Sequence, residues 1–262
     1  MSLITSRGAT GPLAIQAGGS FPTSTDGNLA TLVGTRWDLS DGREVMLVST
    51  GATAISTAGI LLQDEPIQAN HVNLAVTTVT AYSANGNIPA SIAVTLGATA
   101  LTANEYQGGF AVVNAGAGIG QTLRIASHKS ALASATNVTI TLEDSPNTAL
   151  ATATSKVSLI PAHATRVVMM PTTATNVPVG VSLYPLVAGT TAVPNNSYGF
   201  VTSKGITSVL SDATVPAAGA QIIPSVTTAG AITVNSGTSG SIIGYALQAG
   251  VSAEARSVFI NV

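Results

Sequence analysis

The sequence predicts an all-β protein built from β-sandwich or β-barrel units, with an extended terminal arm and little helix. Apolar and polar residues alternate in short segments, as they do in half-buried strands. Gly, Asn, Asp and Pro separate these segments at intervals of about ten residues, a spacing typical of sandwiches and barrels. Helical periodicity is almost absent. The segments expected to form strands are 92–96, 138–142, 157–160, 231–234 and 257–260.

The composition limits the classes of partner. The 262 residues include 9 basic and 11 acidic residues, so that charged residues make up 8% of the chain, against about 25% in a typical domain. A net charge of −2 gives no electrostatic basis for nucleic-acid binding. No apolar stretch approaches the ~20 residues that a membrane span needs. We therefore expect no nucleic-acid or membrane partner, and a surface that neighbouring protein subunits cover.

The N-terminal half is expected to contain an arm and two β units. Residues 1–30 are rich in Gly, Ser and Thr without a clear period, which predicts an extended arm. Residues 31–85 form a β unit that opens with a hairpin, because the Asp41-Gly42 pair lies between apolar positions and both turn residues are expected to need positive φ. Residues 86–160 form a second β-rich domain. Within it, the alanine-rich stretch 125–136 is the one place where a helical turn competes with strand.

The C-terminal half is expected to begin with a connector. Residues 161–190 contain Pro161, Pro171, Pro178 and Pro185, which favours a connector or a set of edge strands. Residues 191–262 form a C-terminal β unit that can pack with 31–85.

The residues that often carry catalysis form no recognisable motif. The chain has no cysteine, and its histidines His71, His128 and His163 lack metal-site spacing. The segment Gly116-Ala117-Gly118-Ile119-Gly120 has neither the spacing nor the following helix of a nucleotide-binding loop, so we expect a β-turn or bulge. The carboxylates form three small groups. Asp38 and Asp41 of the first are expected to serve the hairpin as turn and cap residues, with Arg36 or Arg43 as partners. These groups are Asp38/Asp41/Glu44, Asp64/Glu65 and Glu143/Asp144. We therefore predict no catalytic, cofactor-binding or metal-binding residues, and no enzyme activity.

Several segments, taken in order, resemble the capsid decoration (cement) proteins of tailed bacteriophages. The resemblance runs over roughly residues 35–262, and the order of the segments carries more weight than any one of them. The closing Gly-x-Ala-Leu followed by a strand is similar to phage head decoration proteins more widely. The segments are 39–44, 51–63, 94–100 with 106–110, 120–128 with 142–144, 198–205 and 243–250.

This resemblance implies a structural virion protein on the outer surface of the capsid, made in the cytoplasm of the bacterial host. Its implied partners are the major capsid protein and further copies of itself, a trimer being favoured over a dimer. Multivalency on a capsid lattice lets modest contacts give strong retention. The alternatives are a tail, baseplate or fibre component and, from another class, a carbohydrate-binding adhesin module. The adhesin would need aromatic side chains on the surface.

Overall fold

We describe a computed structural model that covers residues 2–6, 13–15, 32–80, 90–189, 197–214, 216–237, 240–251 and 253–262. The all-β prediction is confirmed. The described residues contain β-strands, one short 3₁₀ helix at Ala69–His71, and no α-helix. In the alanine-rich stretch, strand β9 (Thr122–His128) extends to residue 128. The five segments expected to be strands are β7 (Ser91–Val94), β10 (Val138–Leu142), β11 (Lys156–Ile160), β16 (Ile232–Val234) and β18 (Ala255–Asn261).

The described residues divide into two compact units. The barrel unit runs from Pro66 to His163, and the sheet unit consists of the chain up to Glu65 and from Ala164 onward. The barrel unit is thus an insertion between two parts of the sheet unit. The predicted boundary at 85/86 differs from this division because it separates β6 (Leu74–Thr80) from β7, which are paired antiparallel strands of the barrel.

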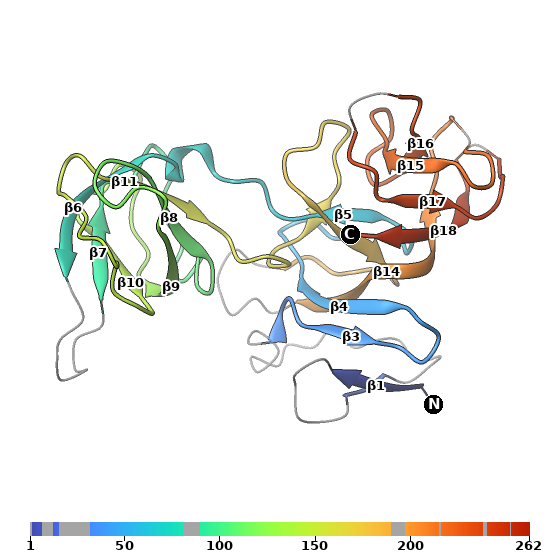
Figure 1. Cartoon of the computed structure of the whole chain (residues 1–262), viewed down its shortest axis with the longest axis horizontal. Helices are drawn as coiled ribbons and strands as arrows, with labels where there is room; N and C mark the ends of the chain where they lie inside the picture. The colour runs from blue at the N-terminus through green and yellow to red at the C-terminus, as the bar shows by residue number, and fades with distance from the viewer. Residues whose placement is uncertain are drawn as a thin grey trace. The chain divides into compact units, whose positions relative to one another are not determined.

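The barrel unit is a closed barrel of six strands in the order β10-β7-β6-β11-β8-β9, with β8 at Phe110–Ala115 (Figure 1). All six neighbouring pairs are antiparallel. The period of two places one face of each strand inside the barrel, so that alternate residues such as Val138, Ile140 and Leu142 of β10 are buried. A barrel of this size is filled by its own side chains. Its core also includes Val76, Ile92, Val94, Val113, Ile125, Val157 and Leu159.

The sheet unit contains one sheet of twelve strands. Its main path is β16-β15-β17-β18-β14-β4-β3-β1-β2, while β13 pairs with β14 and β5, and β12 pairs with β5. The remaining bounds are β1 (Ser2–Ser6), β2 (Leu13–Ile15), β3 (Arg36–Asp38), β4 (Glu44–Ser49), β5 (Leu61–Gln63), β12 (Val168–Met169), β13 (Pro178–Ser182), β14 (Tyr198–Leu210), β15 (Gln221–Pro224) and β17 (Gly244–Ala246).

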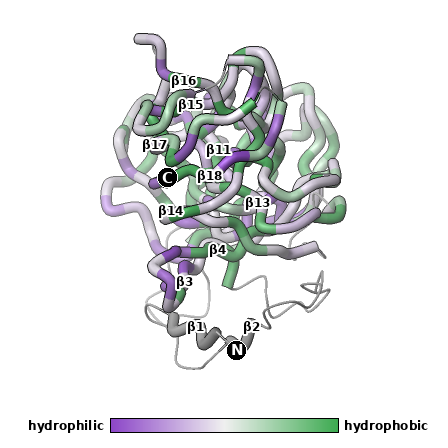
Figure 2. Tube along the Cα trace, turned by 90° about the vertical axis from the view of Figure 1, so that its right-hand side faces the viewer, coloured by the Kyte–Doolittle hydropathy of each residue, from purple (hydrophilic) through white to green (hydrophobic). Residues whose placement is uncertain are grey.

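The thirteen-residue strand β14 holds the sheet unit together. Its first half pairs with β4 and its second half with β18. This joins residues 31–65 to the C-terminal strands, as the sequence allowed. Figure 2 shows the hydrophobic β4 beside the hydrophilic β3. The predicted connector 161–190 contains β12 and β13, and β13 lies between β14 and β5 rather than at an edge.

The predicted hairpin forms between β3 and β4, but its turn differs from the expected one. Gly42 has φ of +82°, whereas Asp41 is not among the residues with positive φ. Leu39 N–H donates to Arg43 O at 2.7 Å, and Gly42 N–H donates to Leu39 O at 3.1 Å. A three-residue loop with one left-handed glycine needs positive φ at only one position. The expectation of two such residues was therefore wrong.

Part of the predicted N-terminal arm is described. Residues 2–6 form β1, whose Thr5 and Ser6 pair with Asp38 and Trp37 of β3. Residues 13–15 form β2, which pairs with β1. The other residues of the predicted arm 1–30 lie outside the described residues.

Candidate functional site

Asp41, Glu44 and Glu143, three of the carboxylates singled out in the sequence, each form an ion pair with a nearby arginine. Arg43 donates to Asp41 from Nε at 2.8 Å, and this hydrogen bond lowers the pKa of Asp41. Arg43 thus partners Asp41 as expected. Arg36 Nη1 donates to Glu44 Oε1 at 2.8 Å. Glu143 forms an exposed ion pair with Arg124 at 3.2 Å. These partners favour structural roles over general acid–base catalysis.

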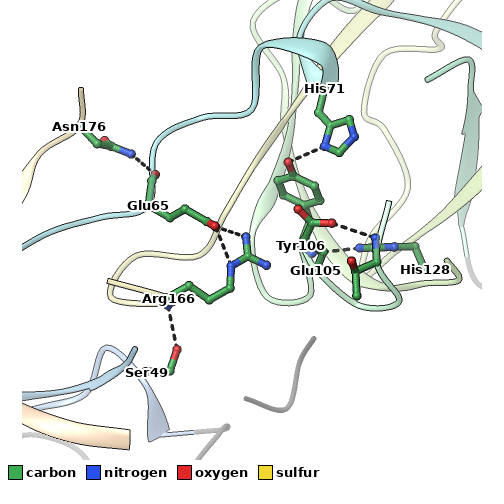
Figure 3. A network of polar contacts seen from close by, with 9 residues as sticks. Ser49, Glu65, His71, Glu105, Tyr106, His128, Arg166 and Asn176 are labelled. Carbon is green, nitrogen blue, oxygen red and sulfur yellow. Dashed lines mark hydrogen bonds and ion pairs between the residues drawn. The ribbon is translucent and has the colours of Figure 1, made fainter. Parts of the chain in front are cut away.

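The pair Asp64 and Glu65 has a larger structural role. The buried guanidinium of Arg166 donates from Nε to Glu65 Oε2 at 2.6 Å, and its Nη2 contacts the same oxygen (Figure 3). Ala164 N–H donates to Asp64 Oδ1 at 2.8 Å, and Arg166 N–H donates to Ser49 Oγ at 2.8 Å. The chain leaves the sheet unit at Glu65 and re-enters it at Ala164. We call this group of contacts the clasp, because it joins the segment where the chain leaves the sheet unit to the segment where the chain returns to it.

Two histidines that are far apart in the sequence meet around Tyr106 inside the barrel unit. Tyr106 N–H donates to His128 Nε2 at 2.9 Å, and the Tyr106 hydroxyl lies 2.7 Å from His71 Nδ1 (Figure 3). Since His128 Nε2 accepts, its Nδ1 carries the proton and donates to Lys129 O at 3.1 Å. Both imidazoles are buried and satisfied by the barrel. Residue spacing could not reveal this grouping, because loop 101–109 brings Tyr106 between the two rings.

The glycine-rich segment is a turn, as predicted. Residues 116–121 connect β8 to β9, and Gly116, Gly118 and Gly120 all have positive φ. The Gln121 side chain donates to Thr148 O at 2.9 Å and accepts from Thr148 N–H at 3.0 Å. The loop is held by the protein itself, and strand rather than helix follows it.

Among the residues that the structure describes, no group of three His, Cys, Asp or Glu side chains is placed to hold a metal ion. The helices described there include none long and apolar enough to cross a membrane.

Half of the described aromatic residues fill the cores, while Phe110, Tyr245 and Phe259 are exposed. Trp37, Tyr106, Tyr198 and Phe200 are buried, while Tyr82 lies outside the described residues. Tyr184 is half-buried and accepts a hydrogen bond from Phe200 N–H at 2.8 Å. Burial raises the pKa of Tyr184 to about 12 and outweighs the opposing effect of that N–H.

The raised pKa of Tyr184 predicts a loss of stability at high pH. The unfolded chain releases this proton at about pH 10, whereas the native state keeps it to about pH 12. The stabilisation is therefore complete below about pH 10 and is lost as the pH rises towards 12. Urea unfolding of wild type and Tyr184→Phe at pH 8, 10 and 11 checks this: the wild type should lose more stability than the variant. Identical pH profiles would contradict the assignment.

Among the exposed large apolar side chains, one group lies on three neighbouring strands. Ile206 of β14 lies opposite Phe259 of β18, and Phe259 lies opposite Tyr245 of β17. Their exposed fractions are 57%, 39% and 48%. Leu247, two residues beyond Tyr245, is 45% exposed. We call this surface the C-terminal face. The sequence alone does not indicate this face, although the alternation in 257–260 places Phe259 on the side of the sheet away from the buried Val258 and Ile260.

Comparisons with models of known protein families, with curated proteins and with solved structures find no match to this chain.

Proposed function

We propose that this chain is a structural virion protein that decorates the outer surface of a phage capsid and stabilises it by binding the lattice of the major capsid protein. The sequence resemblance over residues 35–262 carries the proposal. The segment Gly244-Tyr245-Ala246-Leu247, followed by a strand, is its closing motif. In the described structure these residues begin at β17, which pairs with the following strand β18.

The architecture and the composition support a binding scaffold rather than an enzyme. A closed barrel and a twelve-stranded sheet provide rigid surfaces. Most of the carboxylates considered for chemistry, and the two buried histidines, have structural partners. Charged residues make up only 8% of the chain, and the cores of protein interfaces are depleted of charge. We therefore propose the major capsid protein and further copies of this chain as partners, with no catalytic activity.

A reconstitution experiment tests the proposal. Purified protein is added to emptied capsids that lack it, unbound protein is removed, and bound copies and the temperature of particle rupture are measured. We expect saturable binding at many sites and rupture at a higher temperature. Binding at a few sites on the tail would instead favour the tail-component alternative. Absence of binding to both capsid and tail would overturn a virion role.

A further inference from the structure

The C-terminal face has an apolar row with polar residues on both sides. The row is Ile206–Phe259–Tyr245, and residues directly opposite one another share a face of the sheet. On one side Lys204 pairs with Asn261, and on the other Ser208 pairs with Ser257. Lys204 is the single charged residue among these seven positions. An exposed apolar patch rimmed by polar residues commonly marks an interaction site.

We propose that the C-terminal face pairs with the same face of a second copy of the chain, about a two-fold axis parallel to the Ile206–Phe259–Tyr245 row. Each apolar row then lies against its counterpart. The flank that carries Lys204 in one copy faces the flank that carries Ser208 in the other. The partner is a second copy because a nearly uncharged face needs a nearly uncharged partner, and this face provides one.

Charge decides the direction of the axis. A two-fold axis along the strands would also stack the two apolar rows, but it would place the two copies of Lys204 on the same flank. An axis along the row places them on opposite flanks, where each faces hydroxyl groups. Like charges near each other oppose association. The axis along the row is therefore favoured.

The area of the face indicates a weak dimer. Three strands about 4.8 Å apart, followed over five residues of about 3.3 Å each, give roughly 240 Å² per copy. Stable complexes bury about 800 Å² per partner, so we expect self-association in the micromolar-to-millimolar range. A two-fold pairing forms a dimer, whereas the sequence favoured a trimer. The inference does not rest on the capsid role, because purified protein alone tests it.

Sedimentation velocity over a concentration series tests the pairing. We expect wild type to shift reversibly towards dimer as its concentration rises. Phe259→Ser should weaken dimerisation at least about tenfold, because it removes the centre of the row. Leu132→Ser is the matched control, since Leu132 is 81% exposed but belongs to the barrel unit. Circular dichroism and urea unfolding establish that each variant is folded.

A second variant tests the axis and does not depend on losing an apolar side chain. Ser208→Glu places a carboxylate opposite Lys204 of the other copy, twice in each dimer. We expect dimerisation about three- to tenfold stronger at low salt, with the gain disappearing in about 0.5 M salt. Unchanged or weaker dimerisation in this variant would overturn the proposed axis.

Two results would overturn the self-association itself. One is a wild type that stays monomeric at every concentration. The other is a Phe259→Ser variant that dimerises as well as wild type. If wild type is monomeric and Phe259→Ser no longer binds emptied capsids, the face belongs to the capsid protein. If wild type is monomeric and binds a glycan on an array, and Phe259→Ser loses that binding, the face is a carbohydrate-binding surface. In both cases the binding of wild type to emptied capsids in the reconstitution experiment tests the capsid role separately.

Discussion

Replacing Arg166 by alanine should destabilise the sheet unit by about 3 kcal/mol, at the lower end of the range for breaking a buried ion pair. The Arg166 side chain is 1% exposed and that of Glu65 is 26% exposed. The substitution leaves the Glu65 carboxylate without its guanidinium partner. Arg166 has φ of +54°, but alanine also carries Cβ, so the backbone strain at this position is unchanged. The expected loss therefore reports the ion pair and the packing of the arginine stem.

Trp37 makes this loss measurable in the sheet unit. It is the single tryptophan of the chain, and its ring centroid lies 5.6 Å from that of Phe200. Urea unfolding followed by tryptophan fluorescence therefore reports the sheet unit. Arg43→Ala is the control, because it breaks the exposed pair with Asp41 in the same unit and should cost at most about 1 kcal/mol. If both variants lose the same free energy of unfolding, the buried pair of Arg166 with Glu65 stabilises the sheet unit no more than an exposed pair does, and the account of the clasp is wrong.

Replacing Gly116 by alanine should destabilise the barrel unit by about 3 kcal/mol, which combines overpacking with the cost of a left-handed backbone conformation. Gly116 has φ of +78°. An added Cβ would lie 2.6 Å from the carbonyl carbon of Thr154 and 2.7 Å from Cα of Ser155. Both atoms belong to the backbone just before β11, so neither moves without disturbing the barrel.

Gly120 in the same turn provides the matched control. Its φ is +90°, but an added Cβ would meet nothing within 4 Å. Gly120→Ala should therefore cost only about 1 kcal/mol, the conformational cost alone. Hydrogen exchange of the barrel amides measures both variants. Equal losses would mean that conformation alone, and not close packing against β11, explains the glycine at position 116.

The strands could be predicted from the sequence because their signal is local. Alternation in 138–142 places Val138, Ile140 and Leu142 on one face, and this face became the interior of the barrel. The domain boundary at 85/86 could not be predicted in the same way. It depends on which strands pair, and β6 pairs with β7 and β11. Such pairings join residues far apart in the sequence, which composition does not report.

The candidate sites were likewise predictable where they depend on local sequence, and not where they depend on long-range contacts. The turn at 116–120 was predictable, because the glycine spacing and the strand after it are local features. The meeting of His71 with His128 and the clasp between Glu65 and Arg166 were not, since both depend on long-range contacts. The C-terminal face lies between these cases. Phe259 could have been placed on the outer face from alternation, but its neighbours Ile206 and Tyr245 depend on the register of three strands.

A decoration protein of this design would distribute its contacts over many copies. A weak pairing through the C-terminal face is compatible with firm retention, because each bound copy raises the effective concentration of its neighbour. Within the sheet unit, the clasp holds the chain at Glu65 against the segment that starts at Ala164.

The copy number of this chain in purified virions tests the central claim most directly. Quantitative mass spectrometry against the major capsid protein in the same particles provides the ratio. We expect a ratio of the same order as one, as a protein that covers the capsid lattice requires. A handful of copies per particle would contradict capsid decoration and favour a tail component, and absence from the virion would contradict both.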